Sequence, residues 1–151
     1  MFETVVIATD GSQSAQRAVR LALDFADRFD AAVHALYVLD TGELDASPAD
    51  IRADLEDALD AAGGEALSYV EEHAVEAADG RDVITSIREG DPATEIIDYA
   101  EEYDADVIAT GTRGRHGDHA FLLGSVAEAI VRRSPIPVLT IRQLSEEERP
   151  V

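Results

Sequence analysis

Hydrophobic residues are concentrated in five short runs, which small and polar residues separate. The runs cover residues 2–9, 31–39, 82–89, 105–111 and 136–142. The first of them, FETVVIAT, is β-branched and apolar without a clean alternation of polar positions. That pattern is typical of a strand buried on both faces of a parallel sheet. We therefore predict five strands.

Between the strands, apolar residues recur at spacings of three and four, which predicts amphipathic helices. They are expected at residues 12–29, from Ser47 to about Ala78, from Asp91 to Tyr103, and at residues 125–133. For the second helix, Ser47 is the expected N-cap and Pro48 the first helical residue. The pair Gly63-Gly64 leaves the apolar face of this helix in phase, so it predicts a weak point within one helix. Residues 40–47 are expected to form a loop.

Strands that alternate with helices predict an α/β sandwich with a mostly parallel sheet. We expect a single-domain, doubly wound (Rossmann-like) fold with five mostly parallel strands in the order 3-2-1-4-5 and four helices. The α/β domain is expected to cover residues 1–142, and residues 143–151 a charged tail.

The net charge of the chain argues against some classes of binding partner. The chain holds 32 acidic residues against 12 basic ones, all of them Arg, for a net charge of −20. Such a surface repels phosphate backbones and anionic lipids, so we expect no nucleic acid and no membrane as partner. Acid enrichment without Lys resembles proteins of halophilic organisms, although a merely acidic mesophilic protein is the alternative. We expect a cytoplasmic protein, because no stretch approaches the length of a membrane span.

Missing residue types exclude several mechanisms. Without Cys there is no disulfide, thiolate nucleophile or zinc–thiolate site. Without Lys there is no Schiff base and no P-loop lysine. The serines have no evident His–Asp partners and there is no G-x-S-x-G elbow, so no serine hydrolase is indicated.

Two of the predicted strands end in polar, glycine-containing turns. Thr9-Asp10-Gly11-Ser12 follows the first strand, and the fourth runs into Thr110–Gly114. Doubly wound sheets bind ligands at the carboxyl ends of strands where the strand order reverses. If these two strands are neighbours, both turns share one crevice. The helix that begins at Gly124-Ser125 would point its unpaired N–H groups at an anion there, so the stretch has the features of a phosphate cradle.

The spacing of these glycines is specific. Gly111, Gly114 and Gly124-Ser125 form G-x2-G-x9-G-[S/T], the ATP-binding signature of the universal stress protein family. The opening VVIATDGSQSA and the closing LLGSVAEAIVRRSPIPVLTIR are also similar to that family. The resemblance covers the whole chain in order and length.

The resemblance implies a site for ATP and Mg²⁺. Asp10 would face the phosphates and their Mg²⁺, and Val38 would meet adenine through its backbone, with Ala8 and Thr9 on the same side. Arg113 or Arg115 would lie near the phosphate charge. The ribose and phosphates would be bound by Gly111, Gly114, Gly124, Ser125 and Val126. The alternative is that the glycines serve only tight turns, as in family members that do not bind ATP. Asp118 departs from many relatives, and another acid near a triphosphate lowers affinity unless it is screened.

The histidines allow further interpretations. His116, Asp118 and His119 could suggest a metal site, but a solvated loop explains them more simply. His34 lies in a predicted strand, as a core or interface histidine, and His73 lies on the polar side of a helix.

The function predicted from the family is an ATP-binding stress-response regulator that binds ATP rather than turning it over, with no catalytic residue assigned. A homodimer is expected through the edge formed by Val138, Leu139, Thr140 and Ile141. The alternatives are a slow Mg-dependent ATPase or nucleotidyl-transfer enzyme, and a structural dimer with an empty pocket.

Overall fold

The strands form a single parallel sheet. The computed structural model describes residues 1–76, 82–112 and 123–144. The strand order is β3-β2-β1-β4-β5, and all four neighbouring pairs are parallel. The strands are β1 (Thr4–Ala8), β2 (Ala32–Asp40), β3 (Val83–Gly90), β4 (Val107–Gly111) and β5 (Val138–Ile141). The predicted fold class and strand order are confirmed.

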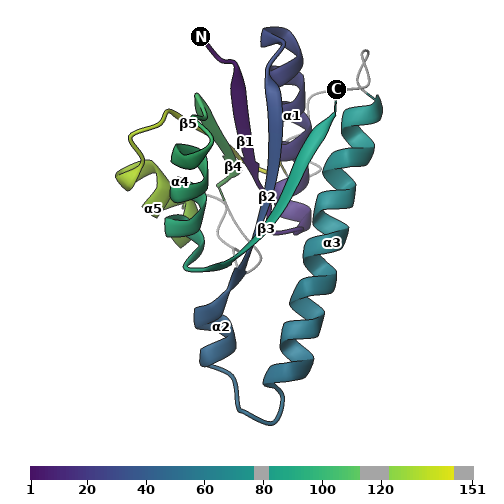
Figure 1. Ribbon diagram of the computed structural model, residues 1–151, viewed down its shortest axis with the longest axis vertical. Helices are drawn as coiled ribbons and strands as arrows, with labels where there is room; N and C mark the ends of the chain where they lie inside the picture. The colour runs from purple at the N-terminus through teal and green to yellow at the C-terminus, as the bar shows by residue number, and fades with distance from the viewer. Residues whose placement is uncertain (77–81, 113–122, 145–151) are drawn as a thin grey trace.

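Helices cover both faces of the sheet (Figure 1). The helices α1 (Gln13–Phe29) and α3 (Arg52–Glu76) pack on one face. On the other face lie α4 (Pro92–Glu102) and α5 (Ser125–Arg133). The side chains of α4 that face the sheet include Ile96 and Tyr99, and α5 contributes Ile130. This layering is the doubly wound sandwich expected from the sequence.

The central strand β1 explains why its sequence does not alternate. Val5 and Ile7 belong to the core under α1 and α3, whereas Val6 and Ala8 belong to the core under α4 and α5. Each of these four side chains is at most 7% exposed. A strand buried on both faces needs apolar residues at every position. The hydrophobic run of β1 is therefore a consequence of its central place.

The segment after β2 differs from the prediction. Residues Thr41–Asp45 form a short helix, α2, so the described part of the chain contains five helices rather than four. The Asp40 carboxylate caps α2, accepting from the backbone N–H of Gly42 at 2.9 Å and of Glu43 at 3.4 Å. An Asp at this position is a strong helix-start signal. The interpretation of residues 40–47 as a loop was wrong because it overlooked this cap.

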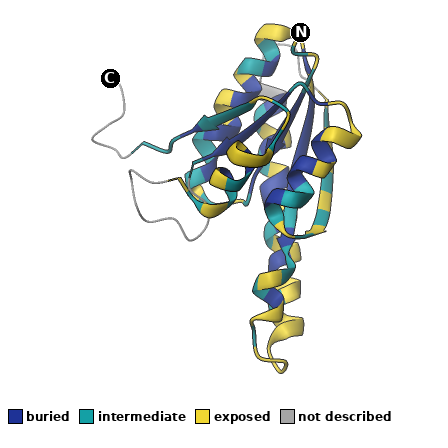
Figure 2. Cartoon of the chain, turned by 90° about the vertical axis from the view of Figure 1, so that its left-hand side faces the viewer, coloured by how far each residue is buried: buried dark blue, intermediate teal, exposed yellow. Residues whose placement is uncertain are grey.

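The start of α3 was also predicted wrongly. Ser47 does not cap it: the Ser47 hydroxyl donates to the carbonyl oxygen of Glu43, within α2. The guanidinium of Arg52 donates to the carbonyl oxygens of Leu44 and Ser47, and α3 begins only there. From Arg52 the helix continues through Gly63-Gly64 without a break, as predicted. Figure 2 shows α2 and the first turns of α3 as a largely exposed arm that extends beyond the sheet.

His34 lies in the core, which is one of the two positions predicted for it, core or interface. It is 6% exposed, and its Nδ1 shares a hydrogen bond of 2.8 Å with the Tyr99 hydroxyl. That hydroxyl also shares a hydrogen bond with the hydroxyl of Ser86. Burial lowers the pKa of His34, because desolvation disfavours the charged imidazolium. His73 is half-buried on α3, where its ring stacks on that of Tyr69.

None of the helices in the described ranges is both long enough and apolar enough to pass through a bilayer.

Candidate functional site

A cavity of about 290 Å³ opens at the carboxyl ends of β1 and β4. The two strands are neighbours, with Ala8 paired to Thr110. The chain passes from β1 to β2 on one side and returns to β4 on the other, so the strand order reverses here. This is the position at which doubly wound sheets hold ligands. Asp10 of the first turn and Gly111 and Thr112 of the second therefore line one cavity, as expected for the described parts of the two turns.

The cavity gathers predicted site residues from separate parts of the chain. Those among the lining residues are Ala8, Thr9, Asp10, Val38, Gly111, Gly124, Ser125 and Val126. Arg113, Gly114 and Arg115 lie outside the described residues, as do His116, Asp118 and His119. The structure brings together every predicted binding residue that it describes.

The turn after β1 holds Asp10 at the cavity. Asp10 Oδ1 accepts from the backbone N–H of Ser12 at 2.9 Å, and the N–H of Gly11 donates to the Thr9 hydroxyl at 3.1 Å. Gly11 has a φ of +77°, a left-handed conformation that glycine adopts readily. These local bonds give the turn a defined shape and place a carboxylate at the rim of the cavity.

The N-terminus of α5 forms the opposite side. Its N-cap is Gly124, which has no side chain to satisfy the first-turn N–H groups. The backbone N–H of Gly124 itself donates to the carbonyl oxygen of Thr112, which joins the helix start to the end of β4. An uncapped N-terminus carries a partial positive charge and free donors. This side of the cavity is suited to an anionic group.

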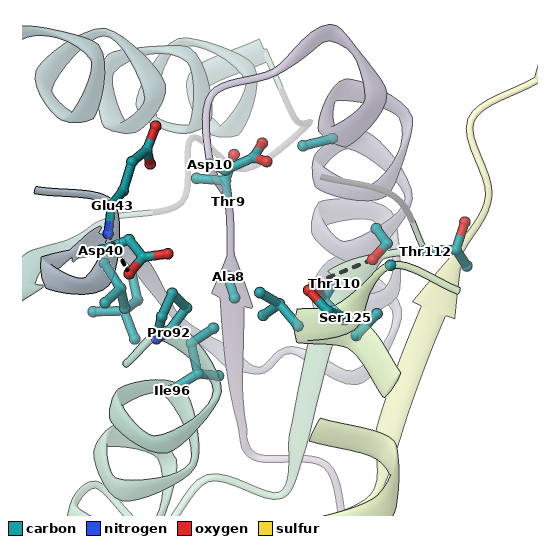
Figure 3. Close-up of a pocket in the computed structure, with 17 residues that line it drawn as sticks. Ala8, Thr9, Asp10, Asp40, Glu43, Pro92, Ile96, Thr110, Thr112 and Ser125 are labelled. Atoms are coloured by element: carbon teal, nitrogen blue, oxygen red, sulfur yellow. Dashed lines mark hydrogen bonds between the residues drawn. The ribbon is translucent and has the colours of Figure 1, made fainter. Parts of the chain in front are cut away.

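An apolar wall lies across from the α5 terminus, as Figure 3 shows. It is formed by Leu36 and Val38 of β2 with Pro92 and Ile96 of α4. Pro92 and Ile96 were not predicted, because the glycine motif gives no indication of which helix closes the site. The sequence did contain a signal for the start of this helix. Asp91 follows β3 directly and caps α4, accepting a hydrogen bond from the backbone N–H of Thr94.

Two further carboxylates lie at the cavity on the α2 side. Asp40 and Glu43 line it, and Figure 3 shows them across from Asp10. Sequence reasoning missed both, because it treated residues 40–47 as a loop without a place in the site. The cavity thus combines an apolar wall, an uncapped helix terminus and carboxylates at its rim.

Metal-ligating side chains are not clustered in the described ranges. These ranges contain no group of three or more His, Cys, Asp or Glu residues arranged to hold a metal ion.

These features define the class of protein: a Rossmann-like α/β sandwich with a crevice at its topological switch point. The model of the universal stress protein family matches residues 1–142, and the chain belongs to that family. The universal stress protein MJ0531 of Methanocaldococcus jannaschii is 38% identical over 148 residues, covering 97% of this chain and 86% of its own.

Solved structures agree with the fold. Universal stress protein UspA from Lactobacillus plantarum has a TM-score of 0.78 and 27% identity, covering 93% of this chain and 98% of that chain. A universal stress protein crystallised in complex with cAMP has a TM-score of 0.64 and 28% identity, covering 93% of this chain and 97% of its own.

Proposed function

We propose that this universal stress protein binds ATP at the carboxyl ends of β1 and β4 and acts as a cytoplasmic nucleotide-dependent regulator. One observation carries the proposal. Residues that the family signature assigns to the nucleotide come from β1, β2, β4 and α5, and those within the described ranges line one cavity. The relative crystallised with cAMP supports an adenine nucleotide as the ligand class.

The two sides of the cavity suit the two ends of the nucleotide. Adenine is placed against the apolar wall of Leu36, Val38 and Ile96, where its flat ring replaces water. The phosphates are placed towards Gly124 and Ser125, at the uncapped terminus of α5. The reverse orientation would put the triphosphate against apolar side chains and next to Asp40 and Glu43, which electrostatics disfavours.

Mg²⁺ fits this arrangement as part of the ligand. Protein-bound Mg²⁺ is held by one or two carboxylates together with phosphate oxygens and water. Asp10 lines the cavity and would supply the carboxylate. Because the protein carries a net charge of −20, Mg²⁺ would also reduce repulsion of the triphosphate.

The proposal is tested by a substitution that fills the space beside the apolar wall. Val38→Tyr should abolish Mg-ATP binding in titration calorimetry at molar KCl, because the ring occupies the space assigned to adenine. Val131→Tyr is the matched control, since Val131 lies on α5, 49% exposed and outside the cavity lining. Equal affinity in wild type and Val38→Tyr would remove the nucleotide from this cavity.

We further propose that ATP is bound without useful turnover. Phosphoryl transfer needs groups that stabilise the charge developing on the γ-phosphate, and the chain has no Lys for that role. Binding the ground state alone gives no acceleration. Phosphate release from excess Mg-ATP should therefore be far below the ~1–1000 s⁻¹ of typical enzymes. Sustained turnover that is lost in Asp10→Ala would establish the ATPase alternative.

The remaining alternative is a dimer with an empty pocket. Protein purified without added nucleotide and then denatured should release adenine nucleotide, detectable by chromatography and absorbance. A preparation that releases none and fails to bind added Mg-ATP would support that alternative.

A further inference from the structure

The strand β3 forms one edge of the sheet, and β5 forms the opposite edge (Figure 1). Within the described residues, β3 pairs only with β2. The strand contains no proline, and its side chains Ile84 and Ile87 are 53% and 46% exposed. An edge strand of this kind, with exposed β-branched side chains, is a template for pairing with a further strand.

The hydrogen bonds of β2 determine which backbone groups of β3 face the outer edge. The N–H of Ala32 donates to the carbonyl oxygen of Glu3, so even-numbered residues of β2 point towards β1 and odd-numbered residues towards β3. The strands β2 and β3 are parallel, with Val33 opposite Val83, so the odd-numbered residues of β2 bond to the even-numbered residues of β3. The N–H and C=O groups of the odd-numbered residues of β3 therefore face the outer edge.

A second copy of the chain can pair with this edge about a twofold axis, which makes the two β3 strands antiparallel. With the axis at Thr85, the two Thr85 residues lie opposite each other, and Val83 lies opposite the partner's Ile87. All three have outward-facing backbone groups, so they exchange backbone hydrogen bonds with the partner strand. Pairs of β-branched side chains directly opposite each other also stabilise a sheet.

The charges along β3 favour this register. With the axis at Thr85, Asp82 lies opposite the partner's Arg88, and the symmetry repeats this pair. Among twofold registers centred on residues 84 to 87, no other brings opposite charges of the described residues together. Asp82 is exposed. The Arg88 guanidinium lies over the Tyr99 ring and donates to Glu102 at 2.8 Å, and its further N–H groups can serve a second carboxylate.

We propose that β3 is a self-association edge, at which two copies of this chain pair antiparallel about Thr85. Each copy carries a net charge of −20, so the contact needs molar salt, which screens long-range repulsion more than attraction between side chains in contact. It involves one strand from each copy and is therefore weak, forming at millimolar protein concentration. Since β5 is the opposite edge, pairing at β3 would join β5 dimers to one another.

The chain has no Cys, so a single introduced thiol reports on the pairing. In Thr85→Cys the two substituted residues would have Cα atoms about 5.5 Å apart, which a disulfide can span. Glu89→Cys is the matched control, because this residue is also exposed and its side chain lies on the same face of β3. Its two copies would be about 27 Å apart along the paired strands.

Both variants are oxidised mildly at millimolar protein concentration in molar KCl and analysed by non-reducing electrophoresis. Because disulfide formation needs close Cα atoms, Thr85→Cys should form covalent dimers roughly tenfold faster than Glu89→Cys. Equal rates would indicate random collision, and no covalent dimer in Thr85→Cys would indicate that the edge does not pair with itself. Either result would overturn the proposal.

The charge pairs are tested in the Thr85→Cys background. Arg88→Asp places like charges opposite each other and should slow cross-linking roughly three- to tenfold, as expected when two exposed ion pairs become repulsive. Asp82→Arg combined with Arg88→Asp restores both pairs and should recover the rate. Both variants lack the bond from Arg88 to Glu102, so recovery reports on the pairs between strands. A double variant as slow as Arg88→Asp would overturn pairing about Thr85.

The two edges of the sheet are tested separately. Thr140→Pro on β5 should leave cross-linking through Thr85→Cys unchanged. Millimolar KCl should slow it, because repulsion between the copies is then unscreened. Loss of cross-linking in Thr140→Pro would assign the contact to β5 and overturn the proposal. None of these measurements uses ATP, so their outcome is independent of the proposed nucleotide site.

Discussion

Gly63 in the middle of α3 lies directly against the ring of Tyr37 on β2, where a Cβ atom on its backbone would be 2.7 Å from Cδ1 of the ring. Tyr37 is 1% exposed and cannot move aside without disturbing the core. At the next position, Gly64, a Cβ atom would meet nothing within 4 Å. The two adjacent glycines therefore have different roles.

Alanine substitutions should separate these roles. Gly63→Ala should destabilise the protein by about 1–3 kcal/mol through overpacking, less the gain in helix propensity. Gly64→Ala should stabilise it by about 0.5–1 kcal/mol, because it removes the glycine penalty at an exposed helical position. Urea unfolding in molar KCl gives both values. The same sign for both variants would contradict the packing described for Tyr37.

Burial of His34 predicts a dependence of stability on pH. Its pKa is lowered in the folded state, whereas in the unfolded chain it is near the ordinary value of about 6.5. Below that pH the unfolded chain binds the additional proton, so folding stability is retained above about pH 6.5 and falls as the solution is acidified. Urea unfolding from pH 7.5 to 5.5 should show wild type losing stability relative to His34→Gln.

His73→Gln is the control for this experiment, because it removes a half-buried imidazole from the surface of α3 and leaves His34 in place. The part of the pH dependence that His34→Gln removes should still be present in this variant. A His34→Gln variant that follows the same curve as wild type would contradict the assignment to His34.

The outer edge of β5 leads to a prediction about assembly. The carbonyl oxygens of Pro137 and Ile141 accept from Ile108 and Thr112, so odd-numbered residues point towards β4. The backbone N–H of Thr140 therefore faces the open edge of the sheet. If two copies pair through this edge, Thr140→Pro removes a donor between subunits without removing a bond to β4.

Light scattering at micromolar concentration should find wild type as a dimer and Thr140→Pro shifted towards monomer. Thr140→Ala, which keeps the N–H, is the control and should remain dimeric. A monomeric wild type would exclude the β5 dimer.

Salt should stabilise the folded protein. The chain has a net charge of −20, and the ion pairs such as Arg28–Asp24 and Arg132–Glu128 are more than half exposed at both side chains. Exposed pairs of this kind contribute little, so they do not offset the repulsion among carboxylates. The melting temperature should rise as KCl increases from millimolar to molar, because salt screens that repulsion. An unchanged or falling melting temperature would contradict adaptation to high salt.

The fold could be predicted from the sequence because each element carries its own signal. The strand β1 is apolar at consecutive positions, and Asp91-Pro92 starts α4 with a cap and a proline, both of which the structure confirms. The residues at the cavity followed from the family signature, and the structure brings those that it describes to one place. Their binding role remains a prediction.

The parts that sequence did not predict depend on contacts between distant residues. Ser47-Pro48 has the composition of a helix start, but the Ser47 hydroxyl bonds back to Glu43, and α3 begins later. From the sequence alone, Gly63 is interpreted as a weak point in a helix. The structure shows that the ring of Tyr37 leaves no room for a side chain at this position. Tyr99 is fully buried on α4 because His34 and Ser86 provide partners for its hydroxyl, a pairing that no local pattern reveals.

Because β1 lies at the centre of the sheet, we expect the part of the cavity formed by the end of β1 to be more rigid than the part formed by α2. Local opening of a folded protein begins where burial is least, and backbone amides there exchange with solvent first. Val5, Val6 and Ile7 are at most 1% exposed, so we expect the wall that carries Ala8 and Asp10 to open only when the whole domain does. Glu43 belongs to the largely exposed arm, which we expect to open more readily. A ligand in this cavity would therefore meet one fixed wall and one compliant wall, and we expect any adjustment during its binding on the side of the arm.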